Sequence, residues 1–212
     1  AAMDVWGNKS APVSAAFKID TTPPVLTCPV DGPFLLGSGE HAVGQAEVDA
    51  SVSGLDEAAC TLSGTVATES VGPKTLTFTA VDLAGNPATQ NCIYNVIYDF
   101  GGFHPPVEPA PALNEAKAGS AIPLKFNLAG DHGLDVIADG YPSSQPVDCE
   151  TLEPAGELQE TQLLGKSDLS YAPGNGWYSM IWKTEKGWAG ACPALVIRLV
   201  DGTGHRAYFQ FR

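Results

Sequence analysis

Three tryptophans near the C-terminal end are the strongest candidates for a binding site in this chain. Trp177, Trp182 and Trp188 fall within twelve residues. Flat aromatic faces stack on sugar rings, so the three side chains could form a carbohydrate-binding platform. Core packing is the competing interpretation. In a strand, Tyr178, Met180 and Trp182 would share one face and Trp177 would lie on the other, so at least one indole is expected to be core.

Two groups of residues could support catalysis, and neither does so convincingly. The acidic stretch 150–160 contains four glutamates that could supply the carboxylate pair of a glycoside hydrolase. A solvated acidic loop is the interpretation we favour. Ser38 lies close to His41, but the sequence shows no strand–elbow–helix setting and no third partner for a nucleophilic triad. We therefore predict no catalytic residues and no enzyme activity.

Acidic residues offer a weak indication of calcium. Asp131, Asp135 and Asp139 supply oxygen ligands at a spacing that differs from an EF-hand loop. Asp4 and Asp82 stand at expected module ends, where acids either bind calcium or cap turns. The cysteines form no C-x-x-C motif and the histidines are scattered, which argues against zinc. We predict no metal site and no cofactor, with a structural calcium kept as the alternative.

A repeated turn organises the rest of the chain. Residues 80–86, Ala-Val-Asp-Leu-Ala-Gly-Asn, separate the alternating runs 75–79 and 92–96, which predicts a strand, a turn and a strand. Asp82 is placed to accept backbone N–H groups, and Gly-Asn to supply positive φ. The Ala, Asp, Gly and Asn recur in residues 2–8, at a shift of 78 residues. This period predicts a repeated β-sandwich module.

Short alternating or apolar runs, separated by turn residues at roughly ten-residue spacing, predict an all-β chain. The fold class expected is tandem immunoglobulin-like β-sandwiches joined by Pro-rich linkers. Residues 150–160 allow one or two helical turns, interrupted by proline and glycine. The strands expected are 25–28, 34–36, 46–50, 61–67, 75–81, 92–98, 122–128, 176–184, 194–200 and 205–211.

Two proline-containing stretches set the predicted domain boundaries, one at residues 20–24 and one at 98–106. Residues 1–19 are then the terminal hairpin of an upstream immunoglobulin-like module, 20–99 one β-sandwich and 100–212 another. Because the chain begins inside a repeat, we expect it to be part of a longer protein.

Five cysteines in a turn-rich chain indicate disulfides and an oxidising compartment. They can form two bridges in fifteen ways, so the sequence does not fix the pairing. Cys28 ends the first expected strand of the middle module and Cys92 begins its last, and such strands can run side by side. We therefore predict Cys28–Cys92 and, within the last module, Cys149–Cys192. Cys60 remains, either as a free thiol or as a bridge to another domain.

The middle module resembles bacterial immunoglobulin-like and hyalin-type repeats, which occur in tandem in secreted and surface proteins. The resemblance rests on Ile19–Pro24, Thr27-Cys28-Pro29, Ala80-x-Asp82-x-x-Gly85-Asn86 and Cys92-x-Tyr94-x-Val96.

Residues 98–212 resemble the PxKF domain, a family found near the C-terminus of secreted bacterial proteins, with Ala191 where Thr is more usual. The resemblance implies a bacterial, secreted or cell-surface protein and assigns no molecular function. The matching residues are Lys117–Leu128, Gly133-Leu134-Asp135, Trp182-Lys183-Thr184, Trp188–Cys192 and Asp201–Ala207 with Phe209 and Phe211.

Charge limits the possible partners. The net charge of −13 argues against nucleic acid and against anionic membrane surfaces. The run Ala194–Ile197 is too short to cross a bilayer, so no membrane insertion is expected. We predict a non-catalytic extracellular spacer or terminal module that contacts other domains of the same polypeptide and mediates assembly, by self-association, or adhesion. The alternative is a polysaccharide-binding accessory module of a secreted enzyme.

Overall fold

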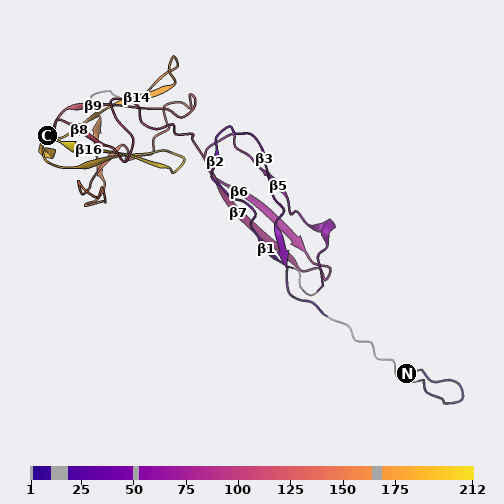
Figure 1. The fold of residues 1–212 in the computed structure, drawn as a ribbon. Coiled ribbons are helices and arrows are strands. Elements are labelled where there is room, and N and C mark those ends of the chain that lie inside the picture. Colours follow the sequence, from indigo (N-terminus) through magenta and orange to yellow (C-terminus); the bar gives the residue numbers. More distant parts are fainter. Residues whose placement is uncertain (1, 11–18, 50–52, 164–168) are drawn as a thin grey trace. The chain divides into compact units, whose positions relative to one another are not determined.

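The computed structural model describes residues 2–10, 19–49, 53–163 and 169–212 (Figure 1). Their regular secondary structure is almost all β-strand, which confirms the all-β prediction. Two short 3₁₀ turns, η1 (Glu57–Ala59) and η2 (Lys186–Trp188), interrupt the strands. No helix in these ranges is long and apolar enough to span a membrane.

The strands are β1 (Val25–Thr27), β2 (Phe34–Leu35), β3 (His41–Val43), β4 (Glu47–Asp49), β5 (Gly64–Val66), β6 (Gly72–Val81), β7 (Pro87–Ile97), β8 (Leu113–Ala116), β9 (Ala121–Phe126), β10 (Ser143–Pro146), β11 (Gln159–Glu160), β12 (Gln162–Leu163), β13 (Ser170–Ala172), β14 (Trp177–Lys183), β15 (Pro193–Arg198) and β16 (Gly204–Phe211).

The chain folds into two compact units. The smaller is made of Ala1–Pro29, Ala42–Gly64 and Leu76–Cys92, and the larger of Val30–His41, Thr65–Thr75 and Ile93–Arg212. The limits of the units fall after Pro29 and within β3, β5, β6 and β7, whereas the predicted boundary lies at residues 99 and 100. That boundary stays a prediction.

Alternation along β7 explains why this segment forms a strand in the first half of the chain. Cys92, Tyr94 and Val96 are buried, whereas Ile93 between them is 71% exposed. This period of two gives β7 one apolar face. β7 lies between β6 and β2 in a three-stranded sheet, with β2 parallel to it.

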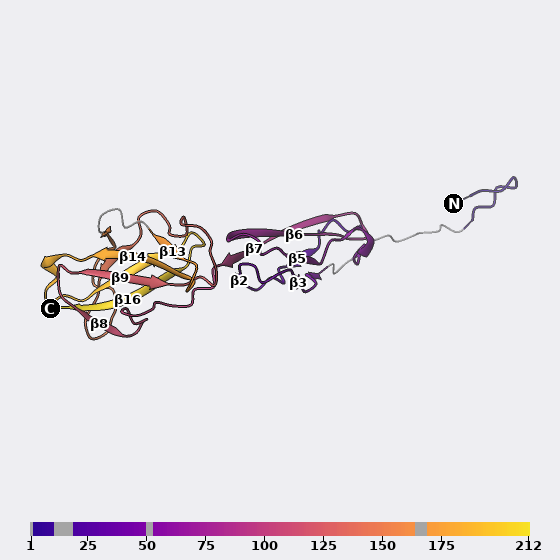
Figure 2. The ribbon, with the colours of Figure 1, turned by 90° about the horizontal axis from the view of Figure 1, so that it is seen from above.

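The larger unit contains a sandwich of two sheets (Figure 2). One sheet has the order β11-β10-β15-β16-β8. The other contains β12, β14 and β13, with β9 also paired to β14. β15 and β16 form an antiparallel hairpin through Asp201–Gly204, as predicted, and Gly202 takes the positive φ that this turn requires (90°).

A single apolar core joins the two sheets. β9 and β14 supply the inward side chains of one sheet, and β15 and β16 supply those of the other. Trp182 on β14 and Phe209 on β16 meet across the sandwich with ring centroids 5.1 Å apart. The buried side chains from these four strands are Ile122, Leu124, Phe126, Tyr178, Met180, Trp182, Leu195, Ile197, Ala207, Phe209 and Phe211.

The structure differs from the sequence-based expectation in two ways. Six short strands, β3, β8, β10, β11, β12 and β13, were not predicted, because each has only two to four residues and no sustained apolar alternation. The possible helical turns within 150–160 do not form. Instead Val147 and Pro154 form a β-bridge, and the carboxylate of Asp148 accepts the N–H groups of Glu150 and Thr151.

The predicted turn at Asp82 is held by its carboxylate. One oxygen accepts the N–H groups of Ala84 (3.0 Å) and Asn86 (2.7 Å), and the other accepts the Asn86 amide (2.8 Å). Gly85 has a positive φ of 87°, but Asn86 does not, so the Gly-Asn prediction holds only for the glycine. Asn86 contributes through its side chain, which also donates to the carbonyl of Asp20.

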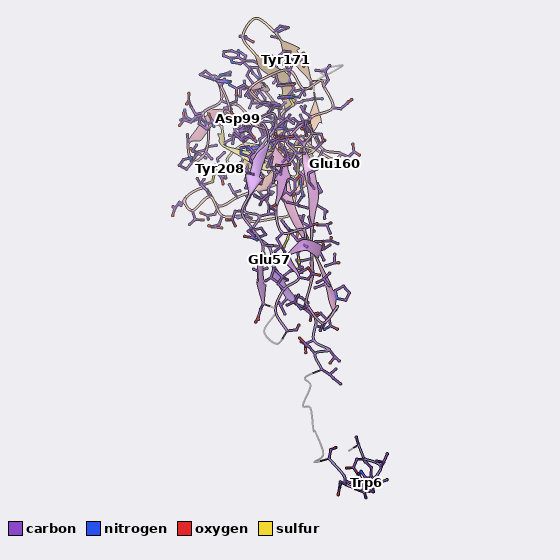
Figure 3. All side chains as sticks on the ribbon, turned by 90° about the vertical axis from the view of Figure 1, so that its right-hand side faces the viewer. Trp6, Glu57, Asp99, Glu160, Tyr171 and Tyr208 are labelled. Atoms are coloured by element: carbon purple, nitrogen blue, oxygen red, sulfur yellow. A yellow bond between two sulfur atoms is a disulfide. The ribbon has the colours of Figure 1, made fainter. Side chains whose placement is uncertain are left out.

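The turn at Asp4 repeats this arrangement. Its carboxylate accepts the N–H groups of Trp6 (2.8 Å) and Asn8 (2.9 Å) and the Asn8 amide (2.9 Å). Gly7 has a φ of 84°. Trp6, labelled in Figure 3, is 85% exposed, so the turn is held by polar bonds rather than by packing of its indole.

Two disulfides are present, and they are the two pairs that the sequence predicts. Cys28 and Cys92 have Cα atoms 5.6 Å apart, and Cys149 and Cys192 have Cα atoms 5.4 Å apart. Cys60 is a free, partly buried thiol. Its sulfur accepts the N–H of Val81 at 3.3 Å, which gives it a structural contact.

Candidate functional site

The structure separates the three tryptophans that the sequence grouped as one platform. Trp182 is fully buried, whereas Trp177 and Trp188 are partly buried. β14 alternates as predicted: Tyr178 and Met180 point into the core with Trp182, and Trp177 points outward. A platform of three indoles is therefore excluded.

Trp182 is a core residue, which corrects its assignment as a candidate sugar contact. Its ring lies 5.1 Å from Phe209, 6.1 Å from Phe211 and 5.6 Å from Trp188, measured between centroids. Its indole N–H has no hydrogen-bond partner among the residues that the structure describes. A ring with no exposed surface cannot stack on a sugar.

Trp177 lies on the outer face of β14 and is already in contact with neighbouring side chains. Its ring stacks on His104 with centroids 4.7 Å apart and planes at 20°. The Lys125 ammonium lies 5.4 Å from the ring centroid, a cation–π distance. These contacts occupy much of the indole, so Trp177 is the weaker of the two remaining candidates.

Trp188 ends η2 and separates two surface hollows. Its backbone N–H donates to the carbonyl of Glu185, which closes the turn. Its ring packs against Trp182 and Phe211, with ring centroids 5.6 and 5.7 Å apart. The rest of the side chain lines both hollows. The core contacts hold the indole in place, so its exposed part is a fixed surface.

The first hollow, which we call the lysine-side hollow, has a volume of about 400 Å³. Apart from Gly119 and Trp188, its lining residues carry a hydroxyl or a charged group at the end of the side chain. Thr184 is buried and its hydroxyl donates to the carbonyl of Ser120 (2.7 Å), which fixes the chain at the base of the hollow. Its lining residues are Gly119, Thr161, Lys183, Thr184, Glu185, Lys186 and Trp188.

The second, disulfide-side hollow has a volume of about 370 Å³. Trp188, the Cys149–Cys192 bridge and Pro146 give it a largely apolar lining, and Asp148 adds one carboxylate. Backbone hydrogen bonds from Thr151 and Glu150 hold the pKa of Asp148 below its usual value, so this carboxylate is charged at neutral pH.

The two hollows are adjacent, because one side chain and one short segment contribute to both. Trp188 lines both, and the segment Gln159–Thr161 contributes Gln159 to the disulfide-side hollow and Thr161 to the lysine-side hollow. Each volume lies within the range of about 300–1,000 Å³ typical of ligand sites. Together they form a candidate groove with an aromatic side chain in the middle.

The sequence pointed to Trp188 but not to its polar neighbours. Lys183, Lys186 and Gly119 come together because β9 pairs with β14, in a register that places Ala121 opposite Lys183. The only signal available was the presence of two lysines between Trp182 and Trp188 in an otherwise acidic chain.

Ser38 and His41 do meet, with the hydroxyl 2.8 Å from Nε2 of the imidazole. The Ser38 hydroxyl also lies 2.7 Å from the carbonyl of Leu35, an acceptor that competes with Nε2 for its one proton. A general base would accept the serine proton. This pair stabilises a turn and is not arranged as a nucleophile and base.

Three of the acidic residues considered for calcium, Asp4, Asp82 and Asp131, act within turns. Asp4 and Asp82 accept the N–H groups described above, and Asp131 accepts the N–H of Gly133 (3.0 Å). Among the residues that the structure describes, no three His, Cys, Asp or Glu side chains gather to hold a metal ion.

The chain matches no protein-family model and no curated protein. Two solved structures show low similarity. One is SGBP-B of the mixed-linkage glucan utilization locus of Bacteroides ovatus, in complex with a mixed-linkage heptasaccharide, at 9% identity and a TM-score of 0.27 over 91% of this chain. This chain spans 48% of that protein's length. The other contains the fibronectin(III)-like modules of Clostridium thermocellum CbhA, at 14% identity and a TM-score of 0.31, covering 89% of this chain and 94% of that one.

Proposed function

We propose that this chain is a non-catalytic module from a tandem array in a larger secreted or cell-surface bacterial protein. The observation that carries the proposal is the repeated turn. Asp4 and Asp82 accept the same three hydrogen bonds, each from a backbone N–H two residues on and from an asparagine four residues on. Two copies of one local structure within one chain are typical of repeat modules.

Disulfides and prolines support an extracellular structural role. The Cys28–Cys92 and Cys149–Cys192 bridges persist in oxidising compartments. Pro23 and Pro24 restrict the backbone between the first turn and the middle module, which favours a stiff connection over a flexible one. Such an array holds a neighbouring domain at a distance and presents its last module for adhesion or assembly. The resemblance of residues 98–212 to the PxKF domain is part of the same proposal.

Small-angle X-ray scattering tests the stiff-spacer role. We would compare the wild-type chain with a variant in which Pro23 and Pro24 are both replaced by glycine. A stiff connection predicts that the variant has a broader distribution of interatomic distances than the wild-type chain. Indistinguishable scattering curves would overturn the spacer proposal.

A second candidate function, polysaccharide binding by the last module, is favoured by Trp188 and its two hollows. A pull-down on insoluble polysaccharides and cell-wall material tests it. Trp188→Ala is expected to abolish binding, whereas Trp177→Ala, the matched aromatic control, is expected to retain most of it. Binding that depends on Trp177 alone would move the site to the outer face of β14, and absence of binding would leave the structural role.

A further inference from the structure

We propose that the groove at Trp188 takes an acidic saccharide, with a sugar ring against the indole and the anionic substituent in the lysine-side hollow. This inference rests on the second candidate function, polysaccharide binding by the last module, and specifies its ligand class. The shared chemistry is a carboxylate or phosphate carried on a sugar.

The lining of the lysine-side hollow carries a net positive charge, which favours an anionic ligand. Its charged lining residues are Lys183, Glu185 and Lys186, a net positive set in a chain with 11 basic and 24 acidic residues. Both lysine side chains are exposed and neither has an ion-pair partner among the described residues. Two free ammonium groups beside one aromatic ring suit an anionic group attached to a ring-shaped ligand.

Gly119 provides room for one of the two lysines. A Cβ placed on this glycine would lie 2.6 Å from Cγ of Lys186, so only a residue without a side chain lets the lysine stem lie there. Gly119 also has a φ of 79°, which other residues rarely adopt. The contact limits the movement of Lys186 and keeps its ammonium group near the hollow.

The second hollow gives the ligand a direction. The disulfide-side hollow carries the Asp148 carboxylate and no basic residue, so an anionic group is disfavoured there. A neutral part of the saccharide fits its apolar lining of Pro146, Val147 and the disulfide. The anionic substituent is therefore assigned to the other side of Trp188.

The net charge of the chain does not prevent this binding. Electrostatic interactions between exposed charges are screened beyond about 8 Å at physiological ionic strength. The two lysines contact the ligand directly, whereas most of the 24 acidic residues act only from a distance. We expect slow association at low salt and an affinity set by the local contacts.

Affinity electrophoresis and isothermal titration calorimetry with three soluble probes test the inference. The probes are polygalacturonate, its fully methyl-esterified form, and a phosphate-bearing mannan. The esterified polymer keeps the sugar backbone of polygalacturonate but loses its charge. We expect binding to at least one charged polymer that is about tenfold or more tighter than to the esterified one.

Variants assign the effect to residues. Lys183→Gln with Lys186→Gln is expected to remove the preference for the charged polymer while leaving residual binding through Trp188. Lys9→Gln with Lys74→Gln removes the same total charge elsewhere and is expected to change nothing. Trp188→Phe keeps an aromatic ring, and Trp188→Ala removes it. Thermal unfolding of every variant shows which of them remain folded.

The outcomes separate the two proposals. Equal binding of charged and esterified polymer, lost in Trp188→Ala, refutes the acidic ligand but retains polysaccharide binding. A preference for charge that survives the double lysine substitution refutes the assigned residues. Absence of binding to all three probes overturns the acidic-saccharide inference, while binding of other polysaccharides in the pull-down would still support the broader function.

Discussion

Loss of the Cys149–Cys192 disulfide is expected to destabilise the last sandwich through the unfolded state. We would replace both cysteines with alanine. Cys192 is 3% exposed and packs with Val147 and Ala194, so alanine avoids burying a hydroxyl group there. The backbone bond from the Val147 N–H to the Cys192 carbonyl (2.9 Å) and the β10–β15 pairing do not depend on the bridge. The folded state should therefore change little.

The magnitude follows from the length of the closed loop. The two cysteines are 43 residues apart in sequence. On the chain-entropy model, closing a loop of this length restricts the unfolded chain by roughly 4 kcal/mol at 25 °C, and typical measured values are about 2–4 kcal/mol. The whole stability of a domain is usually about 5–15 kcal/mol, so the double variant should lose a large fraction of its free energy of unfolding.

Urea denaturation followed by tryptophan fluorescence is the appropriate assay, because three of the four tryptophans belong to this sandwich. With a slope of about 1–3 kcal/mol per molar urea, a loss of about 2–4 kcal/mol should lower the midpoint by roughly 0.7–4 M. Cys60→Ala, which removes a thiol but no bridge, is the matched control and should shift the midpoint far less. A loss below about 1 kcal/mol in the double variant would refute the reasoning and show that the unfolded loop is already restricted.

Three further predictions concern the core, a histidine and the repeated turn. Trp182→Ala should cost about 3–5 kcal/mol of unfolding free energy in the urea assay, whereas Trp182→Phe should cost much less because the indole N–H has no partner to lose. Burial lowers the pKa of His205, which stacks on Phe100 (centroids 3.6 Å apart), below its usual value despite the opposing effect of a nearby carboxylate. Because the folded state favours the neutral imidazole, the stability contributed by His205 is complete above about pH 6.5 and is lost as the pH falls below that value. The melting temperature should therefore drop between pH 7 and pH 5.5. His205→Phe should remove the part of this drop that protonation of His205 causes. Burial raises the pKa of Asp82, but hydrogen bonds from the turn outweigh this effect and hold the pKa below its usual value, so the stability that this group contributes is lost as the pH falls below about 3.9. Asp82→Ala should therefore lower the melting temperature at neutral pH, whereas Asp4→Ala, which breaks the same bonds in an exposed turn, should not.

Side-chain alternation made much of the fold predictable. In β14 and in the second half of β7, every second residue is apolar and buried, so strand type and inward face follow from the sequence there. The turns at Asp4 and Asp82 were equally visible, because short acids and glycines mark such turns directly. Both features depend only on residues that are close together in sequence, so they could be predicted without knowing which strands pair.

Strands that depend on distant partners were missed. β8 (Leu113–Ala116) has no apolar alternation and exists because it pairs in parallel with β16, almost a hundred residues later. β10 (Ser143–Pro146) is polar in sequence and lies between β11 and β15. Tertiary pairing determines both, and a single sequence carries no record of it.

The candidate site shows the same division between local and distant information. Alternation already implied that Trp182 faces the core, so the failure of the three-indole platform was partly foreseeable. The sequence identified Trp188 as a candidate binding residue from its residue type, but it did not identify the residues that surround it. Gly119 lies more than sixty residues before Lys186, and only the β9–β14 register brings it beneath the lysine stem.

That register ties the proposed binding to the stability of the sandwich. The Thr184 N–H and hydroxyl both bond to the Ser120 carbonyl (3.1 and 2.7 Å), immediately beyond the paired strands. These bonds fix the end of β14 against the turn that contains Gly119, and η2 follows directly with Lys186 and Trp188. Thr184→Val should therefore weaken both the fold and the preference for charged polymer, whereas Lys186→Gln should affect only the preference. Loss of the preference in Thr184→Val without any loss of stability would contradict this coupling.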